Sequence, residues 1–249
     1  MPPNDRPHLR VLAGLMAAAV ALMAIYAIWP RLDLAVSAHF YDAASQSFPL
    51  NGQRLPETVR MAVWNLSAVV LTGALVAFLA GLALRRPIAG LPARAWGFMV
   101  ALYALGPGLL VEEGLKSHWG RARPDRVAEF GGTALFSPPW LPTDQCLRNC
   151  SFVSGEAAGG MALALSLGLI LLWWRGRLPR GLWRGLALVA GLLPLAVSAQ
   201  RVMAGRHFLS DVLFAFLFVA ITATILARFL RPLPPPAPAA VDKATDSSY

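Results

Sequence analysis

The sequence predicts an all-α integral membrane protein, a bundle of six transmembrane helices. Hydrophobic residues make up 57% of the 249 residues and charged residues only 14%, whereas soluble proteins are about 45–50% apolar. The apolar residues also gather in six stretches that are long enough to cross a bilayer, which takes about 20 residues in a helix. These stretches are 11–29, 62–84, 95–115, 154–174, 183–203 and 210–229.

The chain is expected to hold one membrane domain, residues 11–231, between two short ends. The first apolar stretch is too long for a signal peptide and lacks a small-residue cleavage site, so we expect it to remain as the first span. It follows a short segment, 1–10. The tail 232–249, PLPPPAPAAVDKATDSSY, is rich in proline and alanine and then polar. Such a composition cannot bury a core, so the tail is predicted to be disordered.

The net charge of +9 could indicate a nucleic-acid-binding protein, but the positions of the basic residues argue against it. They cluster at the ends of spans and in a few loops instead of forming a stripe. The short loops 85–94 and 175–184 together contain seven arginines and no acidic residue. Short basic loops usually remain in the cytoplasm. This rule predicts that both termini are cytoplasmic and that the segments 30–60, 116–153 and 204–209 face outward.

The two cysteines of the chain, Cys146 and Cys150, both lie in the predicted outer loop 116–153. An oxidising compartment would allow a disulfide between them, and their spacing suits a small closed loop. Two free thiols are equally compatible with the sequence. A zinc site would need further thiol or imidazole ligands nearby, so neither a metal nor another cofactor is expected.

The third apolar stretch ends in VEEGLKSHWGRARPDR, which concentrates charge at a helix end. Lys116, Arg121 and Arg123 lie within eight residues of one another. A single residue of this kind would be interpreted as a side chain that reaches toward lipid headgroups. Three together favour an anion site, because charges within spans are rare and usually functional. One of the preceding glutamates, Glu112 or Glu113, could neutralise Lys116 one helical turn away.

The fourth apolar stretch opens with SFVSGEAAGG. Ser154 is a good N-cap, and Gly155 allows another group to approach the backbone closely. The free amides of a helix N-terminus bind anions, although an ordinary cap would have the same sequence. Glu156 follows directly. A carboxylate at the mouth of an apolar helix is costly to desolvate unless a neighbouring group uses it.

The fifth and sixth stretches meet in SAQRVMAGRHFLSDV. His207 and Asp211 are four residues apart, so a helix would place them on one face, where a carboxylate can hold one imidazole nitrogen and leave the other free. A satisfied interfacial histidine is the alternative. All three charged segments lie at the outer ends of spans, so alternating spans bring them together, with Arg201 among the cations. Cations and helix amides can bind the oxygens of a phosphoryl group, and a histidine can attack its phosphorus. The combination therefore indicates phosphoryl chemistry.

These segments resemble the three-part signature of the type 2 phosphatidic acid phosphatase family: Lys-x6-Arg-Pro, Pro-Ser-Gly-His and Ser-Arg-x5-His-x3-Asp. In the second part, Val153 replaces proline and Glu156 replaces histidine, and in the third Gln200 stands where the family usually has serine. The resemblance covers about 60–230. The matching residues are Lys116, Arg123 and Pro124 in the first part, and Arg201, His207 and Asp211 in the third.

The resemblance implies a metal-independent phosphatase that forms a phosphohistidine on the helical core this family shares with haloperoxidases. His207 would attack phosphorus, and Asp211 would orient the ring and balance its charge. Glu156 stands where the family's histidine donates a proton to the leaving oxygen, and we expect Glu156 to be that donor and then the base for hydrolysis. The alternative is that Glu156 only hydrogen-bonds an arginine or a substrate hydroxyl and holds the site together. The phosphate oxygens would be held by Lys116, Arg123, Arg201 and the amides around Ser154 and Gly155.

The wider pattern, FYD, FGG and CLRNCSFVSGEA, is similar to Gram-negative bacterial members of the family, some of which remove phosphate from lipid A. The resemblance therefore implies an inner-membrane phosphatase that acts at the periplasmic face on a lipid A phosphate, at the 4′ position. Phosphatidylglycerol phosphate and undecaprenyl diphosphate are alternative substrates, and phosphate transfer to a lipid is an alternative reaction. A transporter or channel would instead place its charges at broken helices near the midplane. The oligomeric state is not predicted.

Overall fold

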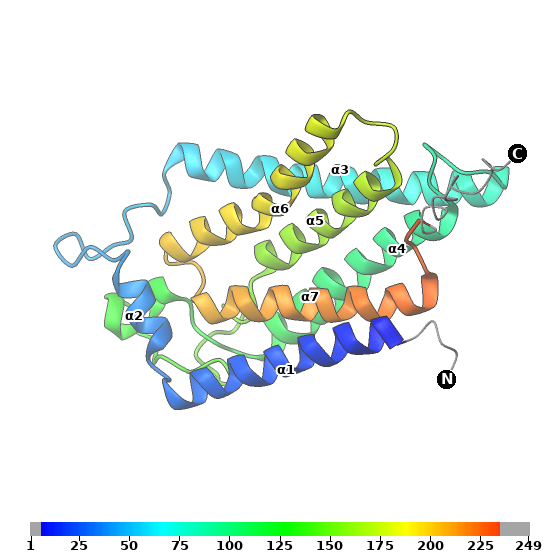
Figure 1. Cartoon of the computed structure of the whole chain (residues 1–249). Coiled ribbons are helices and arrows are strands. Elements are labelled where there is room, and N and C mark those ends of the chain that lie inside the picture. Colours follow the sequence, from blue (N-terminus) through cyan, green and yellow to red (C-terminus); the bar gives the residue numbers. More distant parts are fainter. Residues whose placement is uncertain (1–5, 235–249) are drawn as a thin grey trace, which may run out of the picture.

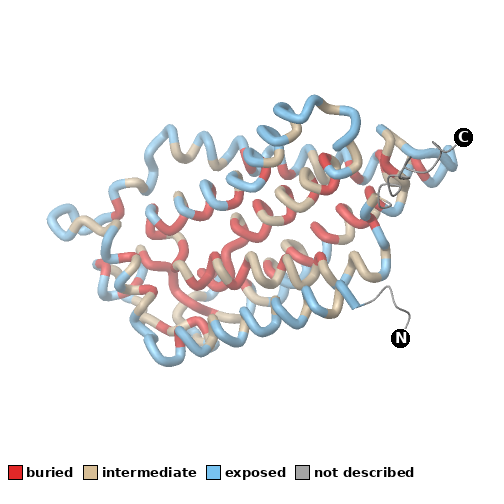
Figure 2. Tube along the Cα trace, in the orientation of Figure 1, coloured by how far each residue is buried: buried red, intermediate tan, exposed pale blue. Residues whose placement is uncertain are grey.

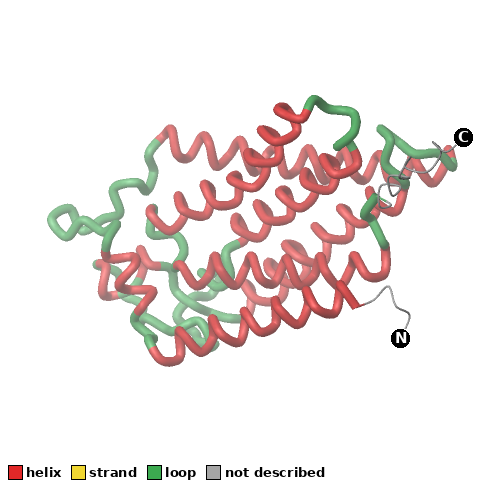
Figure 3. Tube along the Cα trace, viewed as in Figure 1, coloured by secondary structure: helices red, strands yellow, loops and turns green. Residues whose placement is uncertain are grey.

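The computed structural model describes residues 6–234 and shows a bundle of long helices (Figure 1). Six helices in this part of the chain are long and apolar enough to cross a membrane, which confirms the predicted fold class. They are α1 (Arg6–Ile28), α3 (Arg54–Leu84), α4 (Ala93–Tyr103) with its continuation η2 (Ala104–Lys116), α5 (Gly155–Trp173), α6 (Arg180–Met203) and α7 (Leu209–Leu230). Three short helices lie in the connections, α2 (Leu32–Ala38), η3 (Pro124–Arg126) and η4 (Ala128–Phe130). Figure 3 shows helices and loops, with no strand in the described residues.

Helix α3 begins at Arg54, well before the predicted start near residue 62. Its first turns carry Glu57 and Arg60, which lower the hydropathy without ending the helix. These two side chains are three residues apart and form an ion pair, which stabilises a helix. The segment 30–60, expected to be turn-rich, therefore contains α2 and the start of α3. Of the predicted tail, only residues 232–234 are described, and the rest lies outside the described residues.

Helix α5 lies at the centre of the bundle and packs against α3, α4, α6 and α7. Its first turns bury small residues, and a Cβ atom added at Gly160 would lie 3.2 Å from the Cα atom of Pro194 in α6. Small residues of this kind let membrane helices approach closely. Figure 2 shows the buried residues in the interior of the bundle, whereas α1 is largely exposed. The exposed apolar faces of α1 and α3 suit contact with lipid in a membrane.

Helix α4 continues as the π-helical segment η2, which ends at Lys116. Pro107 lies inside this segment and has no amide to donate, which favours a departure from α-helical hydrogen bonding. Glycines fit the wider turns, because a Cβ atom at Gly108 or Gly114 would lie 3.2 Å from the carbonyl oxygen five residues earlier.

The connections that carry the predicted site residues gather at one end of the bundle. Figure 1 shows α2, the end of α6 and the start of α7 at this end, and the start of α1 and the end of α7 at the other. The connections 29–53, 117–154 and 204–208 lie at the first end. The arginine-rich connections lie at the second. The alternation of spans expected from the sequence is therefore present.

Candidate active site

The first turn of α5 and the turn between α6 and α7 meet at a buried histidine. The Nε2 atom of His207 lies 3.2 Å from Oε2 of Glu156. The Nε atom of Arg201, in the last turn of α6, lies 3.4 Å from Oε1 of the same carboxylate. The side chains predicted from two separate motifs are therefore in direct contact, and Glu156 lies between the imidazole and a guanidinium.

The turn 204–208 holds His207 in a fixed position. Gly205 has φ +67°, and a Cβ atom there would overlap the ring of Phe48, so this position requires glycine. The amides of Arg206 and His207 both donate to the carbonyl of Arg201, at 2.9 and 3.3 Å. The side chain of His207 is fully buried. Backbone hydrogen bonds and packing therefore both restrain the imidazole.

The hydrogen bonds of the imidazole differ from the arrangement predicted from spacing. Nδ1 of His207 lies 2.9 Å from the carbonyl oxygen of Ser151 and 3.8 Å from Oδ2 of Asp211. A carbonyl oxygen only accepts hydrogen bonds, so Nδ1 carries a proton and donates it there. Asp211 accepts hydrogen bonds from the Ser151 hydroxyl at 2.5 Å and the Phe208 amide at 2.8 Å. The carboxylate is thus near the ring, while a backbone carbonyl holds the ring nitrogen.

Arg121 connects Asp211 to the connection 29–53 through a fully buried network. Its Nη1 donates to Oδ1 of Asp211 at 2.6 Å and to the hydroxyl of Ser210 at 2.8 Å, and its Nη2 donates to Asp33 of α2 at 2.8 Å. Its Nε donates to the carbonyl of Ser137 at 2.8 Å. Burial alone would lower the pKa of Arg121, but the carboxylates of Asp211 and Asp33 outweigh it and raise the pKa above its ordinary value. This network ties the connection 29–53 to α7 directly behind His207.

Replacing Arg121 by alanine is expected to destabilise the protein strongly. The change leaves two carboxylates, Asp33 and Asp211, buried without their cation, and breaking a buried pair in this way costs about 3–5 kcal/mol. The melting temperature of the detergent-solubilised protein should fall clearly. Arg126→Ala is the matched control, because the Arg126 side chain is 75% exposed. Equal melting temperatures for the two variants would contradict a structural role of the buried network.

Lys116, a predicted phosphate ligand, lies close to Gly155 at the start of α5. Nζ of Lys116 lies 2.9 Å from Oε1 of Glu112, so Glu112, of the two candidates, is the partner of this lysine. A Cβ atom at Gly155 would collide with the Glu112 carboxylate and lie 3.1 Å from Nζ of Lys116. Glycine is therefore the residue that lets the lysine reach the α5 N-terminus.

Ser154 caps α5, because its hydroxyl accepts from the amide of Ala157 at 3.3 Å. Its own amide donates to the carbonyl of Asp211 at 3.1 Å and is not free for a ligand. The amides of Gly155 and Glu156 have no hydrogen-bond acceptor among the described residues. The donors that the helix offers to an anion are therefore those of Gly155 and Glu156.

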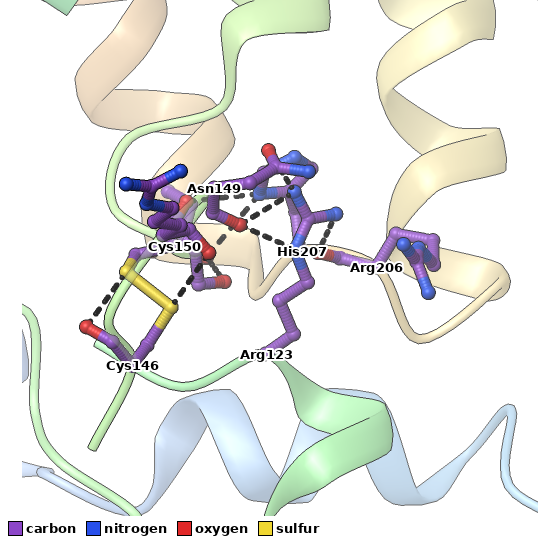
Figure 4. The surroundings of a disulfide bond; sticks show 9 residues. Arg123, Cys146, Asn149, Cys150, Arg206 and His207 are labelled. Atoms are coloured by element: carbon purple, nitrogen blue, oxygen red, sulfur yellow. Dashed lines mark hydrogen bonds and ion pairs between the residues drawn. A yellow bond between two sulfur atoms is a disulfide. The ribbon is translucent and has the colours of Figure 1, made fainter. Parts of the chain in front are cut away.

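Two further cations at the site, Arg123 and Arg201, are not fully satisfied by their partners. Arg123 has no carboxylate within ion-pair distance among residues 6–234, and its donors go to oxygens of Asn149 and Arg206 (Figure 4). Burial, together with the nearby charge of Arg206, lowers the pKa of Arg123 below its ordinary value. Nε of Arg201 is buried and has no hydrogen-bond acceptor within the described part of the chain, apart from its looser ion pair with Glu156. Such groups favour a bound anion.

Several residues of the site had no signal in the sequence. Glu57 and Arg60 on α3 approach it, with Glu57 Oε2 3.6 Å from Nη1 of Arg201 and Arg60 Nη1 3.9 Å from Oε1 of Glu156. Both lie before the predicted start of the second span. Cys146 and Cys150, for which the sequence left two alternatives open, form a disulfide. Within residues 6–234, no group of three or more His, Cys, Asp or Glu side chains is arranged to hold a metal ion.

Residues 94–233, which run from the start of α4 past the end of α7 and include all three motifs, match the sequence model of the PAP2 superfamily. The chain therefore belongs to the PAP2 superfamily, as its motifs indicate, and with six membrane helices it is an integral membrane phosphatase.

Its relatives are similar over much of this length. The chain is 29% identical to a lipid A 4′-phosphatase of Francisella tularensis subsp. novicida (strain U112), over 88% of this chain and 95% of the relative. It is 37% identical to a lipid A 4′-phosphatase of Rhizobium leguminosarum, over 54% of this chain and 55% of that one. The crystal structure of a transmembrane PAP2 type phosphatidylglycerolphosphate phosphatase from Bacillus subtilis has the same fold, with a TM-score of 0.51, 17% identity and coverage of 91% and 98% of the two chains.

Proposed function

We propose that this protein removes the 4′-phosphate of lipid A at the periplasmic face of the inner membrane. The substrate class is supported by the similarity to the Francisella lipid A 4′-phosphatase, which extends over nearly the full length of both chains. The observation that carries the catalytic proposal is the direct contact between His207 and Glu156 beside partly neutralised cations. Phosphohistidine chemistry needs a nucleophilic nitrogen, a proton donor and ligands for phosphate oxygens in one place.

The phosphate would lie between the start of α5 and the cations around it. Lys116, Arg123 and Arg201 supply positive charge, and the amides of Gly155 and Glu156 supply donors at the positive end of a helix dipole. Ser154 supports this phosphate site by capping α5. Because these donors are already oriented in the protein, little reorganisation is needed as negative charge develops on the transferring phosphoryl group.

One proton shared by Glu156 and His207 can serve the first chemical step. Nδ1 donates to the carbonyl of Ser151, so Nε2 faces the Glu156 carboxyl group with a single proton between them. When this proton is on Glu156, Nε2 keeps its lone pair, and it can attack once the Glu156 hydroxyl turns from Nε2 to the leaving oxygen. The bond from Nε2 to phosphorus then forms as the ester bond breaks, and the leaving oxygen takes the proton from Glu156. A proton on Glu156 therefore leaves Nε2 of His207 as the nucleophile and makes Glu156 the acid.

Hydrolysis reverses these roles. The Glu156 carboxylate accepts a proton from water while the oxygen of that water bonds to phosphorus and the bond to Nε2 breaks. Inorganic phosphate leaves, and the starting protonation state is restored. Asp211 lies 3.8 Å from Nδ1, near enough to stabilise the positive charge of the phosphorylated ring, while the carbonyl of Ser151 keeps the ring oriented.

The periplasmic position of the site is supported by two features at opposite ends of the bundle. The disulfide lies in the same connection as Arg123, and disulfides persist in the periplasm but are rare in the cytosol. The arginine-rich connections at the other end fit the cytoplasmic side. We therefore propose that both termini are cytoplasmic and that the domain over 11–231 presents its site to the periplasm.

Cysteine accessibility tests this topology. The native cysteines are joined in a disulfide, so an introduced cysteine is the thiol that an impermeant maleimide would label. In intact spheroplasts, Glu129→Cys should react, whereas Gly176→Cys should react only after the membrane is permeabilised. Both positions are exposed in the fold, so burial does not account for a difference. The opposite labelling pattern would place catalysis in the cytoplasm.

The substrate is tested by offering the purified protein three lipids in the same mixed micelles. Lipid A bisphosphate should be converted fastest, and mass spectrometric fragmentation of the product should show loss of the 4′-phosphate. Phosphatidylglycerol phosphate and undecaprenyl diphosphate are the comparison substrates. Rapid turnover of one of these with unchanged lipid A would disprove the proposed substrate. Appearance of a phosphorylated lipid acceptor without free phosphate would identify a transferase instead.

A further inference from the structure

The disulfide between Cys146 and Cys150 closes a small loop whose last enclosed residue, Asn149, faces Arg123 (Figure 4). The tip of the loop is solvent-exposed, with Leu147 90% exposed, whereas Cys150 is buried. An exposed loop outside any helix is free to move unless a bond or contact restrains it. The loop therefore combines a covalent closure with contact to a predicted phosphate ligand.

Asn149 occupies most of the hydrogen-bonding capacity of Arg123. Nε and Nη2 of Arg123 donate to the backbone carbonyl of Asn149 at 3.0 and 2.9 Å, and Nη2 also donates to its side-chain Oδ1 at 2.7 Å. Nη1 donates to the carbonyl of Arg206 at 3.3 Å. All these acceptors are neutral. They fix the plane of the guanidinium without neutralising its charge, which remains available to an anion.

The backbone conformation of Asn149 allows both of its oxygens to contact Arg123. Its φ is +53°, in the left-handed region that asparagine and glycine adopt more readily than other residues. There its carbonyl and its side-chain oxygen both point to the same guanidinium. The disulfide spans this residue and restricts the backbone on both sides of it.

The chain continues from this loop directly to the imidazole. Ser151 follows Cys150, its amide donates to the carbonyl of Arg121 at 2.8 Å, and its own carbonyl accepts from Nδ1 of His207 at 2.9 Å. The short segment 146–151 therefore contacts both a predicted phosphate ligand and the predicted nucleophile. A displacement of this segment would move the two relative to each other.

We propose that Asn149 is a positioning residue, which orients Arg123 toward the phosphate and is itself held in place by the Cys146–Cys150 disulfide. The inference rests on the proposed role of Arg123 as a phosphate ligand. It adds a residue outside the three motifs to the phosphate site, and it gives the disulfide a role in binding. A disulfide that only stabilised the loop would have no effect on affinity for phosphate in the folded protein.

The test measures inhibition of p-nitrophenyl phosphate hydrolysis by inorganic phosphate in the purified full chain, together with the melting temperature. Arg123→Ala and Asn149→Ala are each expected to raise the phosphate inhibition constant on the order of 10–100-fold, since misplacing a binding group by about 1 Å can cost 10²-fold. Asn149→Gly keeps the left-handed backbone and its carbonyl but loses Oδ1, so it should show a smaller increase. Cys146→Ser/Cys150→Ser should raise the constant as well. Leu147→Ala is the matched control and should leave it unchanged.

The outcomes separate this inference from the proposed function. If Arg123→Ala leaves the phosphate inhibition constant unchanged, Arg123 is not a phosphate ligand and that part of the proposed function fails with the inference. If Arg123→Ala weakens phosphate binding but Asn149→Ala and the double serine variant do not, the positioning role alone is overturned. It is likewise overturned if these variants lower the melting temperature while the folded fraction binds phosphate normally. Should Asn149→Ala not fold, Asn149→Gly decides by the same measurement.

Discussion

Replacement of His207 by alanine is expected to abolish release of phosphate from every substrate. The change removes the proposed nucleophile, and no other histidine among the described residues forms an ion pair with Glu156. Removing the nucleophile of a hydrolase lowers turnover on the order of 10⁶-fold. The loss should be equally complete for lipid A and for p-nitrophenyl phosphate, because a better leaving group does not replace a missing nucleophile.

The decisive measurement is capture of the phosphorylated intermediate. Rapid quenching of the unaltered protein with radiolabelled substrate should yield an acid-labile, base-stable phosphoprotein, the behaviour of a phosphohistidine, and His207→Ala should yield none. His118→Ala is the matched control, because this exposed histidine hydrogen-bonds the carbonyl of Gly114 and not a predicted site residue, and it should retain activity. Near-normal turnover by His207→Ala in folded protein would disprove the mechanism.

The sequence predicts the bundle because a membrane places a simple demand on each span. A spanning helix must be apolar over its whole length, and this property is local and can be seen without knowledge of the neighbours. Helix boundaries follow where hydropathy and structure change together, as for α5 and α7. At α3 they do not, because Glu57 and Arg60 form an ion pair within the helix and contact the charged site at its end.

The contact between Glu156 and His207 could be anticipated because their motifs lie at the same ends of alternating spans. The residues that hold these two side chains in place could not be anticipated. Asp33, Ser151 and Asn149 lie in short helices or irregular connections without a periodic pattern, and each acts on a partner through the tertiary structure. Asp33 meets Arg121 far along the chain, and only the folded protein brings them together.

Asp211 shows how a correct motif can still suggest an incomplete local geometry. Four-residue spacing predicts a direct contact with His207, and the two residues are indeed neighbours. The carboxylate, however, accepts from Arg121, Ser151 and the Phe208 amide, and it lies 3.8 Å from Nδ1. Asp211 is therefore integrated into the buried network as well as near the ring, and its replacement is expected to affect folding in addition to catalysis.

Glu156→Gln is expected to lower turnover of lipid A by roughly 10²–10⁴-fold, the usual contribution of general acid–base catalysis. Glutamine preserves the shape of the side chain, and its oxygen can still accept from Arg201, but it carries no proton to exchange. Its NH₂ group can donate to Nε2 of His207 and occupy the lone pair that attacks phosphorus. The proposed phosphate site of Lys116, Arg123 and the α5 amides remains, so affinity for inorganic phosphate should change much less than turnover.

The leaving group distinguishes a proton donor from a residue that only holds the site together. A sugar alkoxide is a poor leaving group and needs a proton, whereas p-nitrophenolate leaves without one, so phosphorylation of His207 by p-nitrophenyl phosphate should survive better in Glu156→Gln. Hydrolysis of the phosphohistidine, the second step, still lacks its general base in this variant. The variant should therefore release a stoichiometric burst of p-nitrophenol and then turn over slowly, with phosphohistidine accumulating, because water attacks phosphorus only slowly without Glu156. Arg60→Gln, which removes the charge 3.9 Å from the Glu156 carboxylate, is the comparison and should show no burst.

Equal losses on good and poor leaving groups, with no accumulated intermediate, would show that Glu156 does not transfer a proton. Glu156 would then be only a structural contact between Arg201 and His207.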